Sequence, residues 1–141
     1  MLTEKDLLKN KIFQELINLP ISLKDFIIVD KAILGVFDII KISEIEKLDI
    51  LVTQTAQNTL QNLNFENTSN KINILTQWAD GQFSMNDLIR NTFKVGDFQF
   101  LSLKEYLEFL NKSNPAQWEK TKASVKQFMK ANPKLRKYMY K

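Results

Sequence analysis

Apolar residues follow two different spacings along the chain, and each spacing predicts one type of element. Short runs rich in β-branched residues predict buried strands at 26–29, 48–52 and 72–75. Apolar residues that recur every three or four positions predict helices over 4–18, 32–37, 55–63 and 103–110, and a last helix from Pro115 to about Ala131. Alternating residues around Gly96 and Asp97 predict a hairpin. Together these elements predict an α/β (α+β) fold, with a mixed sheet flanked by helices.

Polar residues at the predicted helix starts are of the kinds whose side chains accept hydrogen bonds from free backbone N–H groups. The predicted N-caps are Thr3, Thr53, Ser84, Ser102 and Asn114. Four of these caps have the reciprocal partner of a capping box three residues later, namely Asp6, Asp87, Glu105 and Gln117.

Three further local predictions concern the middle of the chain. Ala79-Asp80-Gly81 predicts a turn. A short strand is expected to begin at Phe65. The helix over 55–63 is expected to pack through one face, which carries Ala56, Leu60 and Leu63.

The length and composition indicate one domain built on one core. The chain has 141 residues, of which 44% are hydrophobic. We expect residues 1–131 to form that domain, including a basic C-terminal helix, and residues 132–141 to form a basic tail. Cysteine and histidine are both absent. Their absence excludes disulfides, thiolate–zinc sites and mechanisms of the Ser-His-Asp or Cys-His type.

The sequence shows no sign of a membrane segment. No apolar stretch reaches the roughly 18 residues that a membrane-spanning helix needs. The first residues, MLTEKDLLKNK, carry both signs of charge and lack the apolar core of a signal peptide. We therefore expect a cytoplasmic protein with no membrane partner. The oligomeric state is left open.

Positive charge is concentrated at the C-terminal end. From residue 112 onward the chain has nine Lys or Arg against one acid, a net charge of +8; since the whole chain is +4, residues 1–111 carry −4. Such asymmetry predicts a partner that is nucleic acid or an acidic protein surface. The candidate binding residues are Lys122, Lys126, Lys130, Lys134, Arg136, Lys137, Tyr138 and Tyr140. The lysines at 122, 126 and 130 should share one exposed helical face, and the tyrosines are candidates to stack on bases. The alternative is a solvated stripe that only aids solubility.

Four segments carry a family resemblance: FIIVDKAILG at 26–35, KLDILV at 47–52, INIL at 72–75 and VGDFQFLSLKEYLEFL at 95–110. They resemble the first strand and its helix, the second strand, the third strand, and the closing hairpin and helix of small nucleotidyltransferase-fold proteins. This superfamily includes the minimal nucleotidyltransferases and the AbiEii-type toxins. The resemblance covers most of residues 5–130. It implies a single nucleotidyltransferase-like domain, a mixed β-sheet flanked by helices.

The departures from the family pattern bear on activity. The resemblance implies three Asp residues that hold Mg²⁺ for phosphoryl transfer. At the matching positions this chain has Lys47, Asp49 and Asn73, so only Asp49 agrees. The family's Gly-Gly or Gly-Ser turn, which lets backbone amides approach phosphate, is replaced by Asp30-Lys31. This implies a degenerate active site with no catalytic residues, no metal ligands and no expected cofactor.

The other carboxylates are weaker candidates for a functional site. Lys47 and Asp49 are interpreted as a structural ion pair or as residues at a strand end. Asp30 and Asp38 are candidates to approach the same end of the sheet as Asp49, and Asp38 would complete a residual site if the register were displaced. Solvated acids are expected at Glu44, Glu46 and Glu108.

Two classes of function follow from these observations. The first is a catalytically degenerate nucleotidyltransferase-fold protein that acts by binding nucleic acid, a nucleotide or a protein partner. The alternative is an active nucleotidyltransferase with an atypical metal site, which would use Mg²⁺ to transfer a nucleotidyl group from an NTP. A third possibility is an interaction or regulatory protein of a mobile element, with a different fold.

Overall fold

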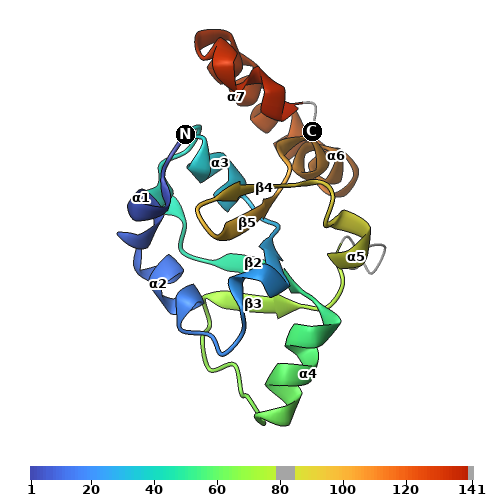
Figure 1. The fold of residues 1–141 in the computed structure, drawn as a ribbon. Coiled ribbons are helices and arrows are strands. Elements are labelled where there is room, and N and C mark those ends of the chain that lie inside the picture. Colours follow the sequence, from blue (N-terminus) through green and yellow to red (C-terminus); the bar gives the residue numbers. More distant parts are fainter. Residues whose placement is uncertain (79–84, 140–141) are drawn as a thin grey trace.

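Five strands form one mixed sheet in the computed structural model, which describes residues 1–78 and 85–139. The strands are β1 (Phe26–Ile28), β2 (Leu48–Val52), β3 (Ile72–Leu75), β4 (Thr92–Val95) and β5 (Phe98–Leu101). Their order across the sheet is β3-β2-β1-β5-β4. β1 is antiparallel to β2 and parallel to β5, β2 is parallel to β3, and β4 is antiparallel to β5. The predicted fold class, a mixed sheet with flanking helices, is confirmed (Figure 1).

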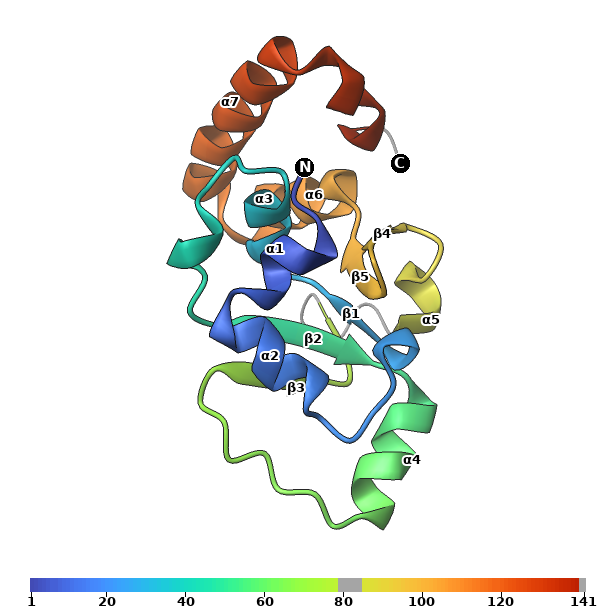
Figure 2. The same ribbon diagram turned by 60° about the vertical axis from the view of Figure 1, so that its left-hand side comes forward.

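Helices lie on both sides of this sheet and beyond its ends. The α-helices are α1 (Glu4–Leu8), α2 (Lys11–Ile17), α3 (Ala32–Val36), α4 (Gln54–Asn62), α5 (Met85–Leu88), α6 (Leu103–Ser113) and α7 (Pro115–Ala131). Short 3₁₀ helices are η1 (Leu23–Asp25), η2 (Ile42–Glu44) and η3 (Pro133–Met139). In both views α4 and α7 lie at opposite ends of the molecule, with the sheet between them (Figures 1 and 2).

The core is centred on the middle strand, β1, and its neighbour β5. Every residue of β1 and β5 is buried, as expected for apolar runs covered on both faces. The ring of Phe13 in α2 meets Phe98 edge-on, with centroids 5.5 Å apart. The same ring lies 6.4 Å from Phe100. Pairs of this kind contribute about 0.5–1.5 kcal/mol beyond their buried area, so they fasten α2 to the sheet.

The predicted helix over 4–18 is two helices, separated at Asn10. The Asn10 Oδ1 accepts a hydrogen bond of 3.0 Å from the Ile12 N–H and caps α2. Its Nδ2 donates to the Ile42 carbonyl at 3.0 Å. Asn side chains compete for backbone groups inside helices. The prediction of one continuous helix was wrong because apolar spacing carries no information about this distant bond.

The strand expected at Phe65 is absent, because its amide is used at the end of α4. Asn64 has a φ of 50°. The Phe65 N–H donates to the Leu60 carbonyl at 2.9 Å, and the Asn64 N–H donates to the Gln61 carbonyl at 3.1 Å. These two bonds form a Schellman motif with Asn64 in the left-handed position. Phe65 therefore ends a helix and starts no strand.

The apolar face predicted for α4 is only partly packed. Ala56 is buried and Leu60 is half-buried, whereas 59% of the Leu63 surface is exposed. The last turn of α4 extends past the edge of the sheet (Figure 1). The prediction that Leu63 packs inward was wrong for this reason.

Most of the predicted helix caps are confirmed. The side chains of Thr3, Thr53, Ser102 and Asn114 each accept a backbone N–H bond at the start of their helix. Asp6 completes the capping box of α1 by accepting from the Thr3 N–H at 2.9 Å. The predicted turn at 79–81 and the cap at Ser84 lie outside the described residues.

Two predicted reciprocal partners have other roles. Glu105 does not return to Ser102, because its Oε1 accepts a 3.2 Å bond from the side-chain amide of Asn91. The Gln117 side chain donates instead to the Thr121 hydroxyl at 3.1 Å. In both cases a partner supplied by another turn or element replaces the local one.

Of the two glycines that the structure describes, Gly96 should be the more sensitive to substitution. Its φ of 59° is left-handed, and an added Cβ would collide with the Glu4 side chain. Gly96→Ala should therefore lower the free energy of unfolding by about 1–3 kcal/mol, as measured by chemical denaturation. Gly35→Ala is the control, because Gly35 lies within α3 and an added Cβ would meet mainly the flexible end of Ile42. That change should stay within about 1 kcal/mol, and equal losses of stability in the two variants would contradict the argument.

Candidate functional site

A cleft of about 660 Å³ opens where β1 ends and β2 begins. Its charged lining consists of the carboxylates Asp30, Glu44, Glu46 and Asp49 and the ammonium groups of Lys31 and Lys47. Its aromatic lining consists of Trp78, which follows β3, and Tyr106 and Phe109 of α6. Because β1 and β2 are antiparallel, the end of one and the start of the other meet at this edge of the sheet.

Asp30 is the best-anchored side chain of the cleft. It follows β1 and stands two residues before Ala32, the first residue of α3. Its Oδ1 accepts the Ala32 N–H at 2.9 Å, and its Oδ2 accepts the Asp49 N–H at 2.8 Å. One carboxylate therefore ties the start of α3 to β2.

The environment of Asp30 opposes its charge. Burial raises the pKa of its carboxyl to about 6, and the nearby charge of Asp49 adds to the rise; the two backbone N–H bonds and Lys31 act in the opposite direction. Burial and the charge of Asp30 together raise the pKa of the Tyr106 phenol to about 12. Tyr106 therefore stays a neutral hydrogen-bonding group at any physiological pH.

The three positions matched to the family's metal ligands are only partly brought together. Asp49 and Lys47 line the cleft. Asn73 lies opposite Asp49 in the β2–β3 register and is exposed. In the described part of the chain, the Asp49 carboxylate accepts no hydrogen bond and forms no ion pair. Of the two interpretations, an ion pair with Lys47 is therefore wrong, and the position of both residues at the start of β2 is confirmed.

The cleft residues do not fit a magnesium site. Hard cations such as Mg²⁺ need several oxygens that converge on one point. Across residues 1–78 and 85–139, no three side chains of the metal-binding types come together in this way. Asp30 and Asp49 are neighbours, but two carboxylates are fewer than such a site needs.

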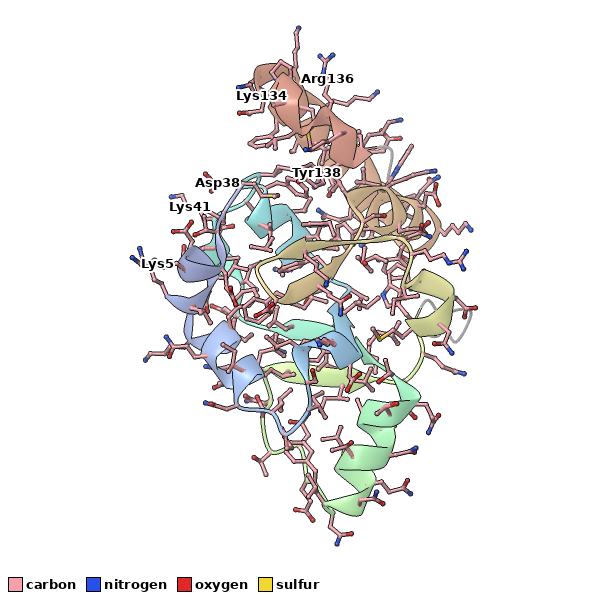
Figure 3. All side chains as sticks on the ribbon, in the orientation of Figure 1. Lys5, Asp38, Lys41, Lys134, Arg136 and Tyr138 are labelled. Carbon is pink, nitrogen blue, oxygen red and sulfur yellow. The ribbon has the colours of Figure 1, made fainter. Side chains whose placement is uncertain are left out.

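Asp38, considered as a second carboxylate, lies elsewhere. It follows the end of α3 with a φ of 64° and is exposed. Figure 3 shows it at the surface on the side of the molecule that carries Lys5 and Lys41. Asp30 and not Asp38 is therefore the carboxylate that adjoins Asp49.

The aromatic wall is a part of the site that the sequence did not indicate. The Trp78 and Phe109 rings lie 4.5 Å apart at an angle of 37°. Tyr106 and Leu110 have the spacing of residues on the inward face of a helix, and both are nearly buried. The i, i+3, i+4 spacing of Tyr106, Phe109 and Leu110 is the signal that could have found the wall, since it places all three on one face of α6.

The predicted lysine stripe on α7 is exposed only in part. Lys126 and Lys130 are exposed. Lys122 is half-buried, with its Nζ 4.4 Å from the centre of the Trp118 ring. The prediction that all three are exposed was wrong for Lys122, because a lysine stem covers apolar surface while its ammonium group is attracted to the ring face.

The segment predicted as a basic tail forms η3 over Pro133–Met139. Lys134, Arg136 and Lys137 are exposed on it, and Figure 3 shows the first two at one tip of the molecule. Tyr138 is half-buried, with its ring 5.2 Å from Phe37 and 5.6 Å from Phe93. Tyr140 lies outside the described residues.

Comparisons with protein-family models, curated proteins and solved structures find no match for this chain. The resemblance to nucleotidyltransferase-fold proteins therefore stays a prediction. Among the described residues, none of the helices has both the length and the apolarity needed to cross a bilayer.

The raised pKa of Asp30 predicts a pH dependence of stability. The folded carboxyl, with a pKa of about 6 against a usual 3.8, binds more protons than the unfolded one between these values. Its contribution to stability is therefore present at about pH 4 and lost as the pH rises through 6. From pH 4 to 7 the free energy of unfolding of Asp30→Asn should gain about 1–3 kcal/mol relative to the parent.

Urea denaturation of both proteins across this range measures the difference. Carboxyl NMR should show the Asp30 midpoint near 6 directly. Asp97→Asn serves as a control, because Asp97 is exposed on the hairpin turn. A pH-independent difference between Asp30→Asn and the parent would contradict the assignment.

Proposed function

We propose that the protein is a catalytically degenerate nucleotidyltransferase-fold protein that acts by binding nucleic acid. The observation that carries the proposal is the basic arm, defined as α7 together with η3. This arm exposes six cationic side chains at one end of the molecule: Lys120, Lys126, Lys130, Lys134, Arg136 and Lys137. The proposal places the protein in the cytoplasm, where an absence of cysteine is compatible with a reducing environment.

The packing of α7 favours an exposed cationic surface. Thr121, Val125 and Met129 recur every four residues and are buried. Lys126 and Lys130 each follow a buried residue by one position, which turns them about 100° away from the packed face. α7 and η3 pack on α6 and on each other, so the basic side chains belong to a structured surface. Phosphate groups are attracted to such a surface without sequence preference.

The chemistry of the cleft supports binding over transfer. Metal-dependent phosphoryl transfer depends on ions that bridge the attacking and leaving oxygens. Lys47 places an ammonium group at one expected ligand position, and Asn73 supplies an uncharged amide at another. The backbone N–H groups of Ala32 and Asp49, which are of the kind that cradle phosphates, already donate to Asp30.

Nucleotidyl transfer should be absent. We expect the pure protein to transfer no label from radiolabelled NTPs with Mg²⁺ or Mn²⁺, because two of the three expected carboxylates are missing. Lys47→Asp combined with Asn73→Asp should create divalent-metal affinity, measurable by calorimetry, if Asn73 and Asp49 face each other as in the β2–β3 register. Transfer by the parent that Asp49→Ala abolishes would refute the proposal and favour the active-enzyme alternative.

Nucleic-acid binding should depend on the basic arm. Replacing Lys122, Lys126 and Lys130 by Gln should weaken binding of a fluorescent single-stranded RNA. It should also reduce the slope of log affinity against log salt by about one for each phosphate that the variant no longer neutralises. Lys5, Lys9 and Lys11, replaced by Gln together, give a control with the same change of charge on α1 and α2.

The outcomes of this experiment separate the proposal from its competitors. Similar decreases of affinity in both triple variants would show that net charge alone attracts the RNA. Weak RNA binding by the parent, together with a stable complex recovered on an acidic protein, would favour a protein partner. The tyrosines are tested separately: where a base stacks on a tyrosine, replacing that tyrosine by Ala should weaken single-strand binding by about 1–3 kcal/mol. Tyr138→Ala also removes a ring packed on Phe37 and Phe93.

A further inference from the structure

We propose that the cleft binds a small organic cation, an ammonium or guanidinium group attached to an apolar body. The proposal is independent of nucleic-acid binding, because the cleft and the basic arm share no residue. It rests on three features of the cleft, which are its charge, its aromatic wall and its size.

The charge of the cleft favours a cation. Four carboxylates and two ammonium groups line it, a formal charge of −2, although the chain as a whole carries +4. Among the described residues, Asp49 has a carboxylate with no hydrogen bond or ion pair. It is only partly exposed, so a cation brought beside it would be screened less than at an open surface. The same charge repels phosphates and other anions.

The aromatic wall supplies the second feature. Trp78 and Phe109 lie with ring centroids 4.5 Å apart, and Tyr106 lies within the electrostatic reach of Asp30. Ring faces attract cations within about 6 Å, more strongly where water is excluded. Val29, Leu75 and Leu110 add apolar surface to the lining. The carboxylates can hold the cationic group of the ligand, and the aromatic rings can contact its apolar body.

The anchoring of Asp30 makes this arrangement rigid. Two backbone N–H bonds of 2.9 and 2.8 Å hold its carboxylate in one orientation. The acceptor is therefore preorganised, so that little of the binding free energy is spent on ordering the Asp30 side chain. Asp49 lies beside it on β2, so a single cationic group can approach both acids.

The size of the cleft points to an organic ligand. Its volume of about 660 Å³ lies within the roughly 300–1,000 Å³ typical of small-molecule pockets. A bare metal ion would leave most of that space unfilled, and the described residues offer no group of three ligands for one. A nucleotide would place its phosphates against net negative charge, where the nearest backbone donors are already occupied by Asp30.

Three phenyl compounds of different charge, together with ATP, test the charge requirement. 2-Phenylethylamine should bind at least about tenfold more tightly than 2-phenylethanol, which has the same ring without the charge. 3-Phenylpropionate and metal-free ATP should bind more weakly than either. The chain has two tryptophans, so in the Trp118→Phe background Trp78, which lines the cleft, is the sole tryptophan, and indole-selective excitation reports on it. Equal affinity for amine and alcohol, or tighter binding of ATP, would overturn the proposal.

Two variants locate the bound amine, each with a matched control. Asp49→Asn should weaken the amine about tenfold and leave the alcohol unchanged, while Asp97→Asn on the hairpin should change neither. Phe109→Leu should weaken both probes, while Phe128→Leu on α7 should not; both phenylalanines are half-buried. Circular dichroism confirms the fold of each variant. Amine affinity that is unchanged in both Asp49→Asn and Phe109→Leu would show that the cleft is not the site.

The source of the cation is decided by two further probes. The amides of N-acetyl-lysine and N-acetyl-arginine present the same groups as they occur on a protein surface. Tighter binding of these amides than of 2-phenylethylamine assigns the cleft to a basic side chain of a partner, and the reverse assigns it to a free amine. Both results support cation recognition. Failure of all the cations overturns it, and the RNA experiment, which uses other residues, is unaffected by that failure.

Discussion

The arrangement of the site depends on the two hydrogen bonds that the Asp30 carboxylate accepts. This carboxylate accepts backbone N–H bonds from Ala32 and Asp49, so it joins the start of α3 to β2 across the end of β1. Partial burial of a charge is unfavourable and raises the pKa of this group to about 6. The same two bonds satisfy backbone donors that would otherwise be left without partners at the sheet edge. The connection between strand and helix is therefore made through an acid.

The position of this carboxylate has a direct consequence for ligands. A turn lined with backbone N–H groups presents positive partial charge to a phosphate. Here the N–H groups of Ala32 and Asp49 already donate to the Asp30 carboxylate, which takes the place that a phosphate would have. Lys47 and the exposed Asn73 on the neighbouring strand add no acid to Asp30 and Asp49. What remains is a cleft with Asp49 unpaired among the described residues and with an aromatic wall from α6. Its chemistry suits a cation better than a triphosphate.

The two charged surfaces of the molecule have opposite signs and separate supports. The acidic cleft depends on strand ends and α6, while the basic arm is positioned by packing between helices. The ring of Tyr138 lies against Phe37 and Phe93, and this contact holds η3 to the body of the protein. Positive charge that would otherwise be on a loose chain end is thereby given a fixed position. The net charge of the chain does not indicate the charge of either surface, because it sums the two.

The sequence by itself determined the strands, most helices and most caps, because these depend on local spacing and on side chains within three or four residues of one another. Thr3 with Asp6, and Asn114 before Pro115, are examples. It also identified Asp49 and the basic arm as the places to examine. Tertiary structure alone decided the bonds from Asn10 to Ile42 and from Asn91 to Glu105, because Asn10 and Glu105 each have a local and a distant possible partner. It also decided that Asp30 anchors the cleft, that Trp78 and Phe109 form its wall, and that Lys122 rests on Trp118. Such groups come together only when elements distant in sequence pack, and no periodicity records which distant surfaces will meet.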